Sequence, residues 1–177
     1  ELLVGLVCAL DDGVMTAYAH FLLVRPEYQG RGIGGQLMTR LLAHYRSIEA
    51  KLEPGLKREF NLMPKAGFEI RPVEAFRAQS AAGGEYNSPS EDGSRPGIFY
   101  VNTYDLPSRK TWDSEDLFLH EAKPGHHFQI AIQQELAGIP KFRRFGGETA
   151  FAEGWGLYSE TIGKELGMLD DPYMYVG

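Results

Sequence analysis

Apolar positions follow two different periods in the first part of the chain. Residues 1–10 (ELLVGLVCAL) are almost continuously apolar and predict a buried strand. Residues 14–24 alternate loosely and predict a second strand, which pairs back as a hairpin through a tight turn at residues 11–13. After the glycine-rich residues 29–35, apolar side chains at positions 37, 38, 41, 42 and 45 recur at helical spacing. Residues 1–47 therefore predict a strand–strand–helix piece.

The pattern changes in the residues that follow this helix. Residues 46–66 are charged and contain Pro54-Gly55 and Pro64, so we place a seam at residues 47–54. Beyond it we expect short strands at residues 67–73 and 98–104, a loop at residues 80–97, and helices that begin near Asp113, cover residues 128–136 and run from about residue 148 to 166. The chain is thus expected to be α+β, with residues 48–177 forming a short β-sheet followed by a mainly helical part.

Composition narrows the classes of function. The 177 residues carry a net charge of −6, which argues against a general nucleic-acid binder because phosphate contacts need clustered Lys and Arg. The single cysteine, Cys8, lies in an apolar run, so it excludes a disulfide framework and favours a buried small side chain. No leader opens the chain and no apolar run approaches the roughly 20 residues of a membrane span, so we expect a cytoplasmic protein. A start at Glu1 rather than Met favours a fragment of a longer chain.

The glycine-rich stretch between the second strand and the helix has the order of a phosphate cradle. Glycines let backbone N–H groups point into one concavity, and the helix N-terminus adds its positive dipole end. Gln29, Gly32 and Gly34 match the Gln/Arg-x-x-Gly-x-Gly/Ala pattern, and the stretch resembles the acetyl-CoA pyrophosphate loop of the GNAT acetyltransferases. The resemblance covers about residues 1–47 and implies acetyl-CoA bound by Gln29, Gly30, Arg31, Gly32 and Gly34. A glycine turn that caps a helix without its enzyme is the alternative.

Three of the five histidines and one acid gather within eight residues, at His120, Glu121, His126 and His127. In a His-Glu-x-x-His helix two histidines one turn apart share a zinc, and the glutamate is the general base. Here the next histidines come six and seven residues after His120, a gapped spacing. Because Pro124 and Gly125 interrupt the helix, a local bulge is expected to return His126 beside His120.

A carboxylate on a separate helix completes the expected metal site. Glu153 lies 27 residues after His126, and its neighbours Gly154 and Gly156 are expected to let that helix approach closely. Glu160, two turns further on, is a candidate to hold a ligand imidazole, and Glu121 is expected to take a proton from a metal-activated water.

Other interpretations of these residues stay open. We favour His126 over His127, since two adjacent histidines cannot both face one metal, although both could simply lie at a helix edge. Glu153 could instead pair with Arg143 or Arg144, and Glu160 could be structural. We expect Tyr104, Trp155 and Tyr158 in the core or in a cleft wall, and Arg95 and Asn102 at the border of the site, where they would contact a substrate backbone or carboxylate.

From about residue 48 to the end, the chain resembles the bacterial "domain of unknown function 885" proteins, which in turn resemble gluzincin-type zinc metallopeptidases. The motifs that carry this resemblance are residues 71–76, 93–103, 120–127 and 151–158. The resemblance implies a mainly helical partial metallopeptidase-like domain, truncated relative to the family, with zinc held by His120, His126 and Glu153 and with Glu121 as base. The expected function is a zinc-dependent hydrolase that cleaves peptides. The alternatives are an acetyl-CoA-dependent N-acyltransferase that uses the first 47 residues and an inactive fused remnant.

Overall fold

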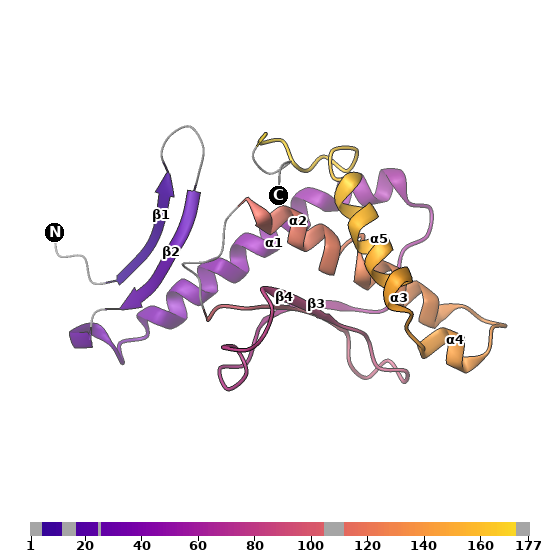
Figure 1. Ribbon diagram of the computed structural model, residues 1–177, viewed down its shortest axis with the longest axis horizontal. Coiled ribbons are helices and arrows are strands. Elements are labelled where there is room, and N and C mark those ends of the chain that lie inside the picture. The colour runs from indigo at the N-terminus through magenta and orange to yellow at the C-terminus, as the bar shows by residue number, and fades with distance from the viewer. Residues whose placement is uncertain (1–4, 12–16, 25, 105–111, 173–177) are drawn as a thin grey trace.

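The computed structural model describes residues 5–11, 17–24, 26–104 and 112–172 (Figure 1). The first two elements are β1 (Gly5–Asp11) and β2 (Ala17–Val24), which pair antiparallel with Gly5 opposite Val24. The predicted hairpin is therefore confirmed, while Asp12 and Gly13 of its predicted turn lie outside the described residues. Within the described residues no helix combines the length and apolar character needed to cross a bilayer.

One long helix, α1 (Ile33–Glu59), runs from the hairpin to the other helices and follows a short 3-10 turn, η1 (Pro26–Tyr28). Residues 47–54, where we placed the seam, lie inside this continuous helix. Gly55 does not break the helix. A Cβ at this position would overlap the backbone of Leu166, so glycine allows α1 and the chain at Leu166 to pack closely. The division of the chain into residues 1–47 and 48–177 itself stays a prediction.

Three short strands form a mixed sheet beneath the helices (Figure 1). They are β3 (Phe68–Pro72), β4 (Gly84–Asn87) and β5 (Gly97–Val101), in the order β3-β5-β4. β3 runs parallel to β5, and β4 runs antiparallel to it. The two strands expected from aromatic and β-branched residues are confirmed, but the expected loop at residues 80–97 contains β4.

Four helices follow the sheet: α2 (Asp113–Glu121), α3 (His126–Glu135), α4 (Lys141–Phe145) and α5 (Thr149–Thr161). Three of them were expected, and α4 was missed. α2 begins at Asp113, as expected, and Trp112 occupies its N-cap position without a side-chain hydrogen bond that caps the helix. α5 also ends earlier than expected, at Thr161.

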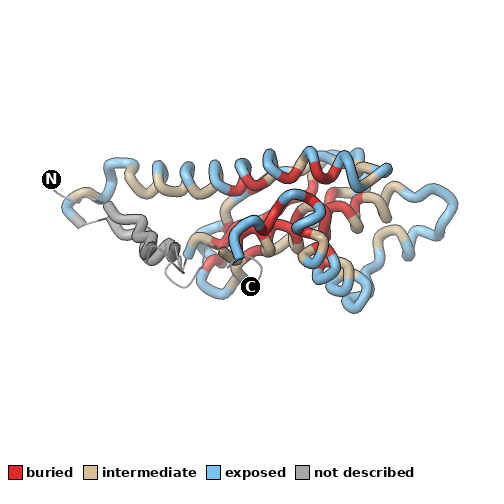
Figure 2. Tube along the Cα trace, turned by 90° about the horizontal axis from the view of Figure 1, so that it is seen from above, coloured by how far each residue is buried: buried red, intermediate tan, exposed pale blue. Residues whose placement is uncertain are grey.

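The core lies where the second half of α1 meets the sheet and α2 and α3. Its fully buried side chains include Leu52, Leu56, Phe99, Phe118 and Phe128. Figure 2 shows the buried positions gathered in this part of the molecule, while the first turns of α1 are exposed or only partly buried. The connection between α2 and α3 therefore joins two helices that are both packed into the core, and this packing restricts where the residues of the connection can lie.

Candidate metal centre

His120 lies near the end of α2, and its ring is held between two acids of α5. Nδ1 is 2.6 Å from Glu160 Oε1, and Nε2 is 3.1 Å from Glu153 Oε2. The first contact is the one expected of Glu160, since a carboxylate behind an imidazole fixes which nitrogen is left for a metal. The side chain of His120 is 17% exposed, so the pair is shielded but reachable from solvent.

The connection between α2 and α3 brings His126 back beside His120. The two rings are 4.8 Å apart, edge to face, as the expected bulge at Pro124-Gly125 requires. A Cβ at Gly125 would overlap the carbonyl oxygen of His120, so only glycine lets the chain fold back this tightly. His126 Nε2 lies 3.7 Å from Glu153 Oε1, which places one carboxylate at both imidazoles.

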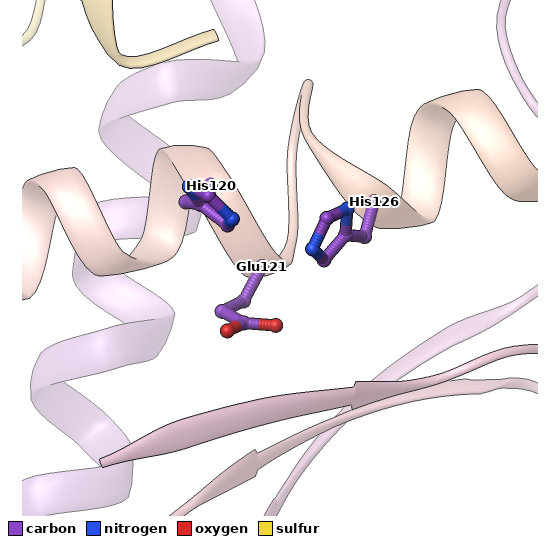
Figure 3. A group of neighbouring side chains, drawn as sticks. All are labelled: His120, Glu121 and His126. Atoms are coloured by element: carbon purple, nitrogen blue, oxygen red, sulfur yellow. The ribbon is translucent and has the colours of Figure 1, made fainter. Parts of the chain in front are cut away.

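His120, Glu121 and His126 each offer one ligand atom, and these atoms lie within 4.8 Å of one another (Figure 3). In the figure the rings of His120 and His126 lie on successive helices, and the carboxylate of Glu121 lies below them on the side of the strands. Two carboxylates thus flank the histidine pair. Glu153 is the closer one, within 3.7 Å of both Nε2 atoms, and Glu121 comes from the helix that carries His120.

Glycine lets α5 come close at one of the two expected positions. A Cβ at Gly156 would lie 2.5 Å from His120 Nε2, so this residue keeps space at the atom that faces Glu153. The expectation for Gly154 was wrong, since a Cβ there meets no described atom within 4 Å.

His127 points away from this group and into the protein. It is 2% exposed, its Nδ1 lies 2.9 Å from the Tyr86 hydroxyl, and its ring packs 4.8 Å from the ring of Phe68. Burial, together with the positive charge of Lys123, lowers the pKa of His127 to about 3. The structure therefore brings His126, and not His127, to the group around His120.

Burial and neighbouring charges shift the pKa values of His120, Glu121 and His126. Burial alone would lower the pKa of His120, but its hydrogen bonds with Glu160 and Glu153 and the charge of Glu121 outweigh burial and raise it. Burial raises the pKa of the Glu121 carboxyl, an effect that the charge of His120 opposes. The pKa of His126 is lowered, first by burial and then by His120.

The donor set fits a zinc ion. Zinc takes imidazole nitrogen and carboxylate oxygen, and a catalytic site has three protein ligands and one open position. His126 Nδ1 is buried without a hydrogen-bond partner among the described residues, so this imidazole is not committed to another structural role through that atom. His120, His126 and Glu153 would hold the ion, with Glu121 beside it.

Several residues named from the sequence lie elsewhere or are already engaged. Asn102 is buried, and its amide donates to the carbonyls of Ala78 and Ala81 at 2.8 Å, so it holds a turn together. Arg144 donates to the Gln134 carbonyl, and Glu153 faces the histidines. Tyr104 and Tyr158 are more than half exposed, whereas Trp155 donates from its indole Nε1 to the Pro124 carbonyl at 2.8 Å.

The glycine stretch lies at the start of α1. Gly30 and Gly32 have φ angles of 74° and 77°, and Gly32 is the N-cap of the helix. Arg31 donates to the Glu27 carbonyl at 3.0 Å and packs over the ring of Tyr28. These are features of a glycine turn that starts a helix, and acetyl-CoA binding at this turn stays a prediction.

Two residues at or near the α2–α3 connection, Lys123 and Gln129, had no recognisable sequence signal. Lys123 pairs with Glu49 and Glu53 of α1 at 2.7 and 3.1 Å, and Gln129 donates from its amide to the Phe151 carbonyl at 2.9 Å. A groove of about 580 Å³ has Ile139, Phe142 and Phe151 among its lining residues. A smaller neighbouring pocket is lined by Gln129 and by Ala152, the residue before Glu153.

The comparisons with known proteins identify the family. The model of the family described as "Bacterial protein of unknown function (DUF885)" matches residues 14–177, so the chain belongs to this family. The match begins well before residue 48 and includes the glycine stretch and all of α1, and nothing in it supports an acetyltransferase. No curated protein matches this chain.

One solved structure is similar over most of the chain. It is "the crystal structure of the putative lipoprotein from Colwellia psychrerythraea", with a TM-score of 0.74 and 33% sequence identity. The similar region covers 78% of this chain and 24% of that chain, so it spans about a quarter of the relative's length.

Proposed function

We propose that this protein is a zinc-dependent hydrolase that cleaves peptides. The observation that carries the proposal is the convergence of His120, His126 and Glu153, with the carboxylate of Glu160 at Nδ1 of His120. This is the arrangement of a metal site in which an outer acid orients one imidazole. The family is one of unknown function, so the support comes from this geometry.

Each residue has a distinct task in this proposal. A bound zinc supplies a Lewis acid that polarises a carbonyl and acidifies water. Glu121, whose pKa is raised by burial, accepts a proton from the attacking water and returns it to the departing amine. His120 is held between two acids and has a raised pKa, so it must release a proton before its Nε2 can bind a metal, and zinc affinity should fall at low pH.

The groove lined by Ile139, Phe142 and Phe151 provides a place for an apolar part of the substrate. A separate neighbouring pocket shares Phe151 with this groove and is also lined by Gln129 on α3 and by Ala152, the residue before the proposed ligand Glu153. A peptide with a large apolar side chain near the cleaved bond is the substrate class that fits this surface.

Hydrolysis of short apolar peptides by the zinc-loaded protein tests the proposal, with Glu121→Gln as the matched variant. We expect cleavage by the wild type that a chelator abolishes, and a Glu121→Gln protein that keeps its zinc but loses at least about 100-fold in rate. Equal rates for both proteins, or a zinc-loaded wild type that cleaves no peptide in the panel, would rule out this mechanism.

Two further predictions stand beside this proposal. Gly30 and Gly32 adopt the positive φ angles that a phosphate-binding turn uses, which is the observation that keeps acetyl-CoA binding as a second candidate. Calorimetric titration with acetyl-CoA tests this second candidate, and the absence of heat at millimolar ligand would rule it out.

A cytoplasmic location is likewise a prediction, which fractionation of the native cell would check.

A further inference from the structure

The connection between α2 and α3 is short, and its course determines whether His126 reaches His120. Six positions separate the two histidines, and the helix is interrupted between them at Pro124 and Gly125. In an unbroken helix, residues six apart point about 120° away from each other around the axis and lie about 9 Å apart along it. The direction in which α3 starts therefore decides whether the two imidazoles can share an ion.

Lys123 fastens this connection to α1. Its ammonium lies 2.7 Å from Glu49 and 3.1 Å from Glu53, which are one turn apart on that helix. It also lies 5.0 Å from the ring centre of Phe68 on β3, and its side chain is only 13% exposed. An ammonium that is shielded from solvent between two carboxylates has few alternative positions, because moving it away would separate partly buried opposite charges.

Trp155 fastens the same connection to α5. Its indole Nε1 donates to the Pro124 carbonyl at 2.8 Å, and Trp155 is two residues after Glu153. The helix that presents the carboxylate to the histidines thus also holds the chain between them. The third constraint is Gly125, where a Cβ would overlap the carbonyl oxygen of His120.

We propose that Lys123 and Trp155 are positioning residues that fix the α2–α3 connection between α1 and α5, so that His126 meets His120 and Glu153 at one metal ion. The inference rests on the proposed zinc site. It gives α1 a part in that site, since Glu49 and Glu53 of this helix are the acids that hold Lys123.

Zinc dissociation constants from chelator competition test the proposal on the full chain, with Lys123→Met and Trp155→Phe as the informative variants. Lys123→Met keeps the apolar stem but leaves Glu49 and Glu53 without their shared ammonium, and Trp155→Phe replaces the indole by a smaller aromatic ring that cannot donate to Pro124. We expect each to weaken zinc binding by about tenfold or more, the range found when groups behind metal ligands are removed. Lys123→Arg should restore most of the affinity, because it keeps the charge.

Lys57→Met is the matched control. Lys57 lies 3.8 Å from Glu53 of the same helix, and its side chain is 71% exposed, so it tests the loss of a surface ammonium from α1. We expect wild-type zinc affinity for this variant. The visible spectrum of the cobalt-substituted proteins gives a second readout, because a shift in the ligand-field bands reports changed geometry at the ion, which a loss of general stability does not produce.

Wild-type affinity and an unchanged cobalt spectrum in both Lys123→Met and Trp155→Phe would overturn the inference and leave the zinc site intact. If Lys123→Met does not fold, Trp155→Phe alone decides in the same way. A wild-type protein that binds neither zinc nor cobalt would instead overturn the proposed function on which the inference rests.

Discussion

Alanine substitution at two glycines of α5 distinguishes two effects. One is the higher helix propensity of alanine, and the other is the loss of the close approach between α5 and His120. Gly154 and Gly156 lie in the interior of the same helix, so alanine at either position should gain about 0.5–1 kcal/mol from helix propensity. At Gly154 the added Cβ meets no described atom within 4 Å, and we expect this gain in full. Gly154→Ala is thus the control for the same chemical change on the same helix.

At Gly156 the added Cβ would lie 2.5 Å from Nε2 and 2.6 Å from Cε1 of His120. Normal contact needs about 3.5 Å or more, so the ring or the helix must move by about 1 Å. Overpacking of this kind costs about 1–3 kcal/mol, which cancels the propensity gain and leaves a net loss of up to about 2.5 kcal/mol. The displaced atom is the proposed ligand nitrogen, so zinc affinity should fall by about tenfold or more.

Urea unfolding of the metal-free proteins and chelator competition for zinc measure the two effects separately. We expect Gly154→Ala to be slightly more stable than the wild type with unchanged zinc affinity, and Gly156→Ala to lose on both measures. If Gly156→Ala matched Gly154→Ala in stability and in zinc affinity, the close approach of α5 to His120 would be wrong, and with it the geometry of the site.

Three further substitutions test other parts of the account. Glu160→Gln removes the charged partner at Nδ1 of His120, so it should lower the pKa of His120 in the metal-free protein and weaken zinc binding by about tenfold. NMR titration would show the change in pKa. An unchanged His120 pKa would contradict this pairing. Burial, together with nearby acids, raises the pKa of Asp116 to about 6. The folded state therefore holds this proton more tightly than the unfolded state, and stability is lost as the pH rises from about 4 to 6. Asp116→Asn should consequently stabilise the protein by about 1 kcal/mol at neutral pH and by nothing near pH 4, because solvent screens the charge of a group that is only partly buried. Equal effects at both pH values would refute this reasoning. Gly55→Ala should destabilise the protein by about 2 kcal/mol or more in urea unfolding, because its Cβ would overlap the backbone of Leu166; wild-type stability would show that α1 does not pack as described.

Elements with a strong local signal could be predicted from the sequence. The hairpin, β3, β5 and α2 have apolar and β-branched patterns that need no distant partner to be recognised. β4 could not be predicted in this way, because Gly84–Asn87 is a weak strand sequence that becomes a strand by pairing with β5. The Pro54-Gly55 pair was misread for a similar reason, since the purpose of Gly55 is its contact with Leu166, far along the chain.

The candidate site was predictable in its residues and only partly in its geometry. The spacing indicated that the chain must fold back at Pro124-Gly125, and the structure brings His126 to 4.8 Å from His120, ring centre to ring centre. Sequence alone could not separate Gly156 from Gly154, because only the packing of α5 against α2 tells which glycine faces the imidazole. Likewise, Lys123 has no local signal, and its role depends on α1 lying beside the connection.

The most direct test of the account is the zinc content of the purified protein after metal loading and exhaustive dialysis, measured for the wild type, His120→Ala, Glu153→Ala and Glu121→Gln. The account predicts one zinc per chain in the wild type and in Glu121→Gln, and little or none in His120→Ala and Glu153→Ala, since these remove proposed ligands from the site. A wild type without zinc, or one zinc retained in both ligand variants, would contradict the claim that these residues form a metal centre.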